Sequence, residues 1–294
     1  MRKFHYKILL HLIILMWGFT GILGKLIHLE AFIIVWYRVI IAFIALGVGM
    51  LVLKRPFRVK DRSELIKIGL VGVLVGLHWL TFYKSIQLST ASLGILCLST
   101  TTLHVSWIEP IIMRRRVSWF EVILGLVVVY GIYFVSTDFK DSEYEALAYG
   151  LCSALFAAGF AVFNTKLSEK NTPAQISLYE MLSASLFISI ILLFQGRIDY
   201  SILKMTTSDF WWLLFLGVLC TSVAFLAIIE IMKKLGAFTV SLSINLEPVY
   251  TLFLAVFILK ENKFLGFDFY VGSLIIVFVV VVNAVRKHLQ KKGF

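Results

Sequence analysis

The stretch WGFTGILGKL (Trp17–Leu26) has an ordered counterpart in AGFAVFNTKL (Ala158–Leu167), about half the chain later. Both stretches carry Gly-Phe, five intervening residues and Lys-Leu. Further matches follow in the same order, at an offset that drifts from 141 to 147 residues: Tyr37-Arg38 with Tyr179-Glu180, Gly72-Val73-Leu74 with Gly217-Val218-Leu219, and Gly125 with Gly272. Such ordered self-similarity indicates an internal repeat, which divides the chain into residues 1–140 and 141–294.

The composition places this repeat in a membrane. Of the 294 residues, 60% are hydrophobic and 15% are charged, whereas a soluble domain carries about 25% charged residues. Ten apolar runs approach the roughly 20 residues that a spanning helix needs: 8–27, 31–53, 65–85, 91–113, 119–137, 147–167, 174–195, 211–232, 237–259 and 268–286. We therefore predict an all-α integral membrane protein with ten transmembrane helices. Five helices per repeat is an odd number, so the repeats should be inverted in the membrane.

The basic residues set the expected orientation. With the N-terminus inside, the inner segments hold 20 Lys and Arg residues and the outer segments hold 6, and such an excess marks the cytoplasmic side. We expect an integral protein of the cytoplasmic (inner) membrane with both termini in the cytoplasm. The basic start should belong to a retained first helix, because no small-residue cleavage site follows it. The net charge of +11 reflects topology, so no nucleic-acid partner is expected.

Several short motifs lie in the helices of both halves: Trp17-Gly18, Lys25, Arg38, Leu246-Glu247-Pro248, Leu259-Lys260-Glu261 and Gly272. With these motifs and two five-helix repeats, the chain resembles the EamA family of the drug/metabolite transporter superfamily. The resemblance implies a ten-helix bundle whose central cavity moves small metabolites, often outward and often amino acids or related compounds. One departure is that Glu261 has Arg114 at the matching place in the first half, so a role of this glutamate need not hold for both halves.

Ionisable residues inside the membrane are the first candidates for function, because a charge at mid-bilayer costs about 2.5–3.5 kcal/mol on insertion scales. Arg38 could anchor a substrate carboxylate or phosphate. Alternatively, it forms a structural ion pair or extends its side chain to the outer surface. Its repeat counterpart Glu180 has no basic neighbour in its own helix, and it is a second candidate for substrate binding or proton coupling.

Two histidines and a run of hydroxyl residues extend the candidate set. His104 follows Ser99-Thr100-Thr101-Thr102 at the middle of the fourth run, where Thr100 and Thr101 could line a polar cavity with it. The alternative is that these hydroxyls bond to carbonyls of their own helix and that His104 bonds to a neighbouring helix. His78 is a candidate of the same kind. No HExxH or CxxC spacing accompanies these residues, so we expect no metal site and no cofactor.

Tryptophans divide into two groups. Trp17 is central in its run and is followed by Gly18, Gly21 and Gly24. Small residues let helices approach closely, so Trp17 should face the bundle or the cavity. The others lie near helix ends or in outer halves, where an interfacial belt is the expected location: Trp36, Trp79, Trp107, Trp119, Trp211 and Trp212.

The pair Glu247-Pro248 lies inside the ninth apolar run. Proline removes one helical N–H, and such a break is tolerated in lipid only where protein or cavity water satisfies the freed backbone. We predict a helix kink at Pro248 in a wet segment, with Asn245 as a nearby polar partner. Glu247 could then bind a substrate amine or carry a proton. The alternative is a fixed hydrogen bond or ion pair with another helix.

These patterns favour a secondary transporter of small metabolites that works by alternating access, with export as the expected direction. The expected partners are a small-molecule substrate and the lipid bilayer, with protons as a candidate coupling ion. The sequence predicts no particular oligomeric state. Two alternatives remain: a membrane-embedded enzyme with a site built from His78, His104 and Glu109, and a non-transporting scaffold. We expect no enzyme activity, because no catalytic motif is present and intramembrane charges with an inverted repeat suit transport better.

Overall fold

The computed structural model describes residues 2–114, 116–136, 141–198, 200–235, 240, 243–244, 246–263 and 265–291, and these form helices and short connections without strands. The first half contains α1 (Arg2–Leu26), α2 (Ala31–Val52), α3 (Arg62–Leu88), α4 (Ala91–Leu98), α5 (Thr101–Met113) and α6 (Trp119–Val135). The second half contains α7 (Asp141–Leu167), α8 (Pro173–Phe194), η1 (Tyr200–Leu203), α9 (Thr207–Leu214), η2 (Phe215–Val223), α10 (Ala224–Leu235), α12 (Glu247–Ile258), η3 (Glu261–Lys263) and α13 (Phe267–Lys291).

The apolar helices coincide with the predicted runs. Seven stretches in the described part of the chain are long and apolar enough to cross a membrane: Phe4–Leu26, Ala31–Val52, Arg62–Leu88, Ala91–Met113, Glu143–Leu167, Pro173–Phe194 and Thr207–Ile228. Three shorter apolar helices, Trp119–Val135, Glu247–Ile258 and Phe267–Asn283, overlap the other three runs. The prediction of an all-helical membrane protein is therefore confirmed, and seven of the ten runs are candidate spans of full length in the described residues. The number of ten spanning helices stays a prediction.

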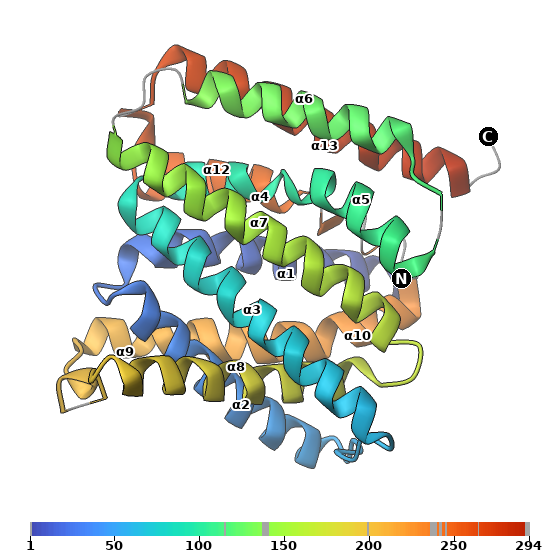
Figure 1. Ribbon diagram of the computed structural model, residues 1–294, viewed down its shortest axis with the longest axis vertical. Helices are drawn as coiled ribbons and strands as arrows, with labels where there is room; N and C mark the ends of the chain where they lie inside the picture. The colour runs from blue at the N-terminus through green and yellow to red at the C-terminus, as the bar shows by residue number, and fades with distance from the viewer. Residues whose placement is uncertain are drawn as a thin grey trace.

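The two halves run in opposite directions. In Figure 1, α1 runs from right to left, whereas its repeat counterpart α7 runs from left to right, and α1 begins on the side where α13 ends. Helix partners are exchanged between the halves in the manner of a two-fold axis. The packing of α3 on α8 is matched by that of η2 on α2, and the packing of α5 on α7 by that of α12 on α1. The pair of α6 and α13 lies along one edge of the bundle.

Left-handed backbone residues show the repeat independently of side chains. Four described residues have positive φ, namely Lys54 (50°), Arg114 (53°), Gly196 (65°) and Lys260 (56°). They form two repeat pairs, because Lys54 and Gly196 end α2 and α8, while Arg114 and Lys260 follow α5 and α12. This geometry terminates helices. It aligns Arg114 with Lys260 rather than with Glu261, a shift of one residue from the sequence match.

Two glycines of the repeat make equivalent close approaches. A Cβ on Gly72 in α3 would lie 2.6 Å from the carbonyl oxygen of Glu180. A Cβ on Gly217 in η2 would lie 2.6 Å from the Ile41 side chain and 3.3 Å from the carbonyl oxygen of Arg38. Each glycine therefore lets its helix approach the backbone that carries the charged residue of the opposite repeat. This close packing fixes where Arg38 and Glu180 enter the bundle.

We expect Gly72→Ala to lower the thermal stability of the purified protein in detergent. The new methyl group would meet backbone atoms, which cannot rotate away, and overpacking costs about 1–3 kcal/mol. Gly76→Ala on the same helix is the matched control, since its nearest atoms would be 3.6 Å away, and alanine should stabilise the helix by about 1 kcal/mol. Equal melting temperatures for the two variants would contradict this packing.

Candidate functional site

Two equivalent helices are interrupted near their middle. The fourth run is divided at Ser99-Thr100 into α4 and α5, and in the ninth run α12 begins at Glu247 with Pro248 in its first turn. The kink at Pro248 stays a prediction, and in the described residues Pro248 lies in the first turn of α12. Proline favours this position, because the N–H it lacks has no helical partner there. Interrupted helices in matching places of two inverted repeats are typical of transporter binding sites.

The eighth run has a different irregularity, which the sequence did not predict. Residues 215–223 form the π-helix η2, with α9 before it and α10 after it. The hydroxyls of Thr221 and Ser222 donate to the carbonyls of Leu216 and Gly217, five residues earlier, at 2.9 Å each. Wider helical turns of this kind frequently occur at functional sites. Here the turn presents Thr221 to the side chain of a buried cation.

Arg38 is that cation, and its exposed fraction is only 4%. Its guanidinium carbon lies 3.7 Å from the ring centroid of Trp79. Its Nε donates to Thr221 Oγ1 at 3.2 Å, and its Nη1 donates to Tyr83 Oη at 3.3 Å. Arg38 therefore does not extend to the outer surface, which excludes one of the two structural alternatives. Among the described residues, two of its five N–H donors have these partners, and the other three have no acceptor there.

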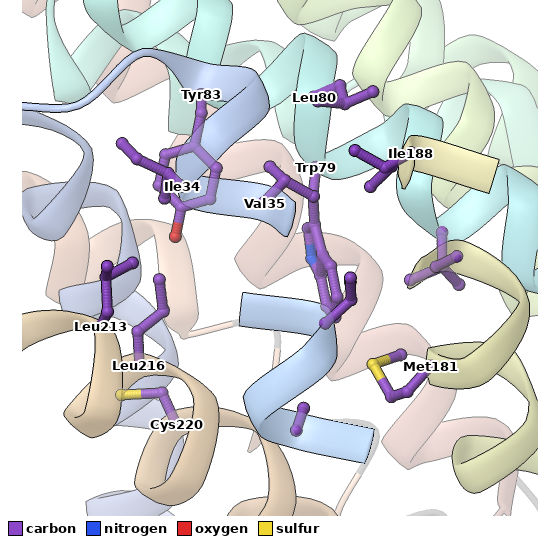
Figure 2. Packing of buried hydrophobic residues seen from close by; sticks show 14 of the residues in the cluster. Ile34, Val35, Trp79, Leu80, Tyr83, Met181, Ile188, Leu213, Leu216 and Cys220 are labelled. Carbon is purple, nitrogen blue, oxygen red and sulfur yellow. The ribbon is translucent and has the colours of Figure 1, made fainter. Parts of the chain in front are cut away.

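Apolar side chains pack around the two aromatic partners of Arg38. Trp79 and Tyr83 project from successive turns of α3, with Leu213, Leu216 and Cys220 on the side of Tyr83 and Met181 near Trp79 (Figure 2). Trp79 is 7% exposed, so its prediction as part of an interfacial belt was wrong. The amphipathic ring is instead used inside the bundle, where its face attracts the guanidinium charge.

Glu247 brings an opposite charge to the same region from the other repeat. Its side chain is half-buried at the start of α12, and it interacts electrostatically with Arg38 without a direct ion pair between the two described side chains. Within the described residues, no donor forms a hydrogen bond to its carboxylate. One turn later, Thr251 donates to the carbonyls of Gly18 and Glu247 at 3.1 and 3.0 Å, which holds this turn against α1.

Trp17 connects α1 to the π-helix. Its Nε1 donates to the carbonyl oxygen of Cys220 at 3.0 Å, and its ring packs against Phe225. The expectation that Trp17 faces the bundle thus agrees with its position between α1 and η2. The adjacent Thr20 hydroxyl donates to the Trp17 carbonyl at 2.7 Å.

Glu180 lies apart from the Arg38 region. It is 4% exposed on α8 and interacts with the Asn164 amide of α7. One carboxylate oxygen, Oε1, and the Asn164 Oδ1 are buried without a hydrogen-bond partner in the described part of the chain. Two buried acceptors without hydrogen-bond partners raise the free energy of the folded protein, and a bound proton or cation would reduce this cost.

His78 has a structural environment. Its Nδ1 lies 2.8 Å from Ser153 Oγ and 3.0 Å from the Ser153 carbonyl, and Ser153 Oγ also lies within hydrogen-bonding distance of the His78 carbonyl at 3.0 Å. The ring stacks on Phe82 and touches Phe160. These contacts join α3 to α7, so His78 serves mainly as a link between the two halves.

Two threonines of the fourth run bond to backbone through their hydroxyls. Thr100 donates to the Cys97 carbonyl at 2.6 Å, and Thr101 donates to the Ala154 carbonyl of α7 at 3.4 Å. His104 is half-buried against Trp107, and its Nδ1 has no partner among the described residues. His104 and Ser99 therefore each keep a buried polar atom without a described partner, whereas the Thr100 and Thr101 hydroxyls are occupied. Asn245, the remaining candidate, lies outside the described residues.

Glu261 has a role that the sequence did not reveal. Its carboxylate accepts hydrogen bonds from the backbone N–H groups of Ala91 and Ser92 at 2.8 and 3.0 Å, and from the Ser92 hydroxyl at 2.5 Å. A carboxylate is favoured at a helix N-terminus by the helix dipole. Because Glu261 follows α12 and the accepted groups begin α4, this contact ties the two interrupted helices together across the repeats.

Comparison with known proteins agrees with the repeat. The fold and the interrupted helices define the class as a helical membrane bundle of two related halves. The sequence profile of the EamA-like transporter family matches residues 6–137 and 145–285, which is most of the chain in two copies. The chain belongs to the EamA-like transporter family. It is an integral membrane protein, and a protein of a transporter family binds small-molecule substrates.

A solved structure has a similar fold. A crystal structure of a protein is 13% identical in sequence and covers 97% of this chain and 99% of its own, with a TM-score of 0.66. At this identity the likeness concerns the fold alone. No curated protein matches the sequence.

We expect Thr221→Val to destabilise the protein by about 1.5–3 kcal/mol, the range for a hydrogen bond to a charged group. The substitution removes a partner of the buried Arg38 at nearly unchanged volume. Thr81→Val is the control, because Thr81 donates only to carbonyls of its own helix. Thermal unfolding in detergent measures both effects. A loss in Thr81→Val as large as in Thr221→Val would argue against a special role of the Arg38 contact.

A second prediction concerns the link between the repeats. Glu261→Ala leaves three donors at the start of α4 unpaired, and we expect the free energy of unfolding to fall by about 1–3 kcal/mol. Asn262→Ala, at the exposed neighbouring residue, should change it little. Chemical unfolding of the two variants in one detergent makes the comparison, and indistinguishable curves would refute the capping role.

Proposed function

We propose that the protein is a secondary transporter that exports small zwitterionic metabolites, such as amino acids, across the cytoplasmic membrane. The observation that carries this proposal is the pair of opposite charges in one interior region, Arg38 from the first repeat and Glu247 from the second. Arg38 keeps unused donors for a substrate carboxylate. The Glu247 carboxylate is free of described donors and suits an ammonium group. A substrate would complete both hydrogen-bond sets at once.

The inverted arrangement of the halves supports a mechanism of alternating access. Residues 1–140 and 141–294 would rock against each other, as ten spanning helices in two inverted sets of five. The irregular turns at Ser99-Thr100 and Glu247 and the π-helix would change most, because their backbones are least constrained by regular hydrogen bonding. Trp17 would follow the movement of η2, to which it is bonded.

Glu180 and His104 are proposed as coupling residues. Each has a buried polar atom without a described partner, so each could gain a proton-dependent contact when the halves move. We propose protons as the coupling ion on this ground. The termini would lie in the cytoplasm, as the basic loops indicate. No enzyme activity is proposed, since the Nδ1 atom of His78 is engaged by Ser153 and the transport family accounts for the fold.

Transport in proteoliposomes tests the proposal. The purified protein should exchange labelled amino acids in counterflow, and Glu247→Gln and Arg38→Gln should each slow exchange by about tenfold or more, as the loss of one charged hydrogen bond of roughly 1.5–3 kcal/mol predicts. Glu30→Gln is the control, because Glu30 is exposed and pairs with Arg197 near the ends of α2 and α8.

Modified substrates identify which charge each residue recognises. N-acetylation removes the ammonium group, so it should slow wild type strongly and add little to Glu247→Gln. Conversion of the carboxylate to an amide should behave in the same way with Arg38→Gln. If a broad panel of amino acids gives neither exchange nor thermal stabilisation, the zwitterion proposal fails.

A further inference from the structure

A pocket lies between α3 and α7. It has a volume of about 590 Å³, within the range of small-molecule sites. It is lined by the first turns of α3 and the last turns of α7. In Figure 1 these two helices lie at the front of the bundle, close together on the left and farther apart on the right, where α3 begins and α7 ends. The pocket therefore lies at the end of these two helices where α3 begins and α7 ends.

The wall of the pocket is apolar and faces outward. It is formed by Leu70, Val73 and Leu74 of α3 and Phe163 of α7, and Leu70 is 65% exposed. Both helices belong to stretches that are apolar enough to cross a membrane. This wall consequently adjoins the hydrocarbon of the bilayer, and an occupant would reach it from the lipid.

The rim of the pocket is charged, with three lysines and two glutamates: Lys67, Lys166, Lys170, Glu64 and Glu169. Glu64 is buried, and it pairs with Lys67 at 2.8 Å and with Lys170 at 3.7 Å. Glu64 thus fixes two ammonium groups at the pocket mouth. Lys166 is exposed and forms no ion pair within the described residues. The rim has an excess of one positive charge and an unengaged cation.

We infer that this pocket binds an anionic phospholipid, with the headgroup phosphate at Lys166 and Lys170 and an acyl chain along Leu70, Leu74 and Phe163. Basic pockets between transmembrane helices on the cytoplasmic side bind anionic headgroups, and the predicted orientation puts this rim on that side. A soluble anion would gain the lysines but not the apolar wall. A neutral lipid would gain the wall but not the attraction to the ammonium groups.

The position of the pocket gives such a lipid a structural effect. Since α3 belongs to the first repeat and α7 to the second, a bound lipid would bridge the two halves. The floor beneath it is already continuous, because Ile68, Val71, Leu167 and Ile176 form a buried cluster of α3, α7 and α8. The lipid would extend this contact outward and favour the conformation in which α3 and α7 are splayed at this end.

Native mass spectrometry of the full-length, delipidated protein provides the test. Dioleoylphosphatidylglycerol should be retained in preference to dioleoylphosphatidylcholine. Lys166→Gln should weaken phosphatidylglycerol retention about fivefold, as expected when one basic residue near an anionic lipid surface contributes roughly 1 kcal/mol. Lys166→Arg should keep retention near wild type. Leu70→Trp, which places a larger side chain in the pocket, should reduce retention of phosphatidylglycerol both alone and in combination with Lys166→Arg.

Matched controls separate this pocket from general lipid contact. The controls are Lys60→Gln and Leu186→Trp. Lys60 is an exposed lysine that does not line the pocket, and Leu186 is a 57% exposed residue of α8. Both variants should retain phosphatidylglycerol as the wild type does. Equal retention in Lys166→Gln, Leu70→Trp and the controls would overturn the inference. Protection from thermal unfolding by glycerol 3-phosphate alone, at the concentration effective for the lipid, would do the same by assigning the pocket to soluble anions. Size-exclusion chromatography verifies that each variant is folded.

Discussion

The buried guanidinium of Arg38 is the constraint around which the interior is arranged. A cation at 4% exposure in a membrane bundle loses its hydration, so the protein must replace water with hydrogen-bond acceptors and polarisable surface. The replacement comes from two helices around a charge carried by α2: α3 supplies the Trp79 face and the Tyr83 hydroxyl, and η2 supplies the Thr221 hydroxyl. Moving any one of these helices alone would expose the Arg38 guanidinium or separate it from its partners.

Irregular backbone is the means by which this environment is supplied. A regular α-helix presents no free carbonyl in its interior, whereas the π-turn of η2 gives Trp17 the Cys220 carbonyl. The same turn would leave other carbonyls unpaired, and the hydroxyls of Thr221 and Ser222 satisfy two of them. Likewise, α12 begins at Glu247 inside the bundle, so regular helical hydrogen bonding is interrupted there. In lipid such breaks persist only where protein or cavity water provides partners, which is why the irregular turns gather near the charged residues.

The sequence predicted the features that depend on composition and on local chemistry. Apolar runs gave the helices, because length and hydropathy alone decide what crosses a bilayer, and Pro248 marked an irregular turn because it lacks an N–H. The break at Ser99-Thr100 and the π-helix carry no comparable local signal, since serine and threonine fit several helical positions. The Glu261 cap joins residues about 170 apart in sequence, and only the fold brings them together. The prediction for Trp79 was wrong for a related reason. A tryptophan in the outer half of an apolar run is expected at the membrane interface, and only the fold shows that a buried cation lies against this ring.

The repeat makes the charges of the two halves unequal, and this inequality suits a cycle between two states. Arg38 and Glu180 occupy the same helical position in α2 and α8. Arg38 contacts two hydroxyls and an indole ring, whereas Glu180 interacts with the Asn164 amide, and one oxygen of each of these two side chains is buried without a described hydrogen-bond partner. In inverted-repeat transport, the halves exchange conformations between the two states. The close contact of Gly72 with Glu180 would then take on the geometry of Gly217 with Arg38, where a Cβ placed on the glycine would lie 3.3 Å rather than 2.6 Å from the backbone carbonyl oxygen. Glu180 would gain room for a partner as Arg38 loses it. Opposite charges at equivalent positions would therefore give the two states different polar interiors, as the proposed transport cycle requires.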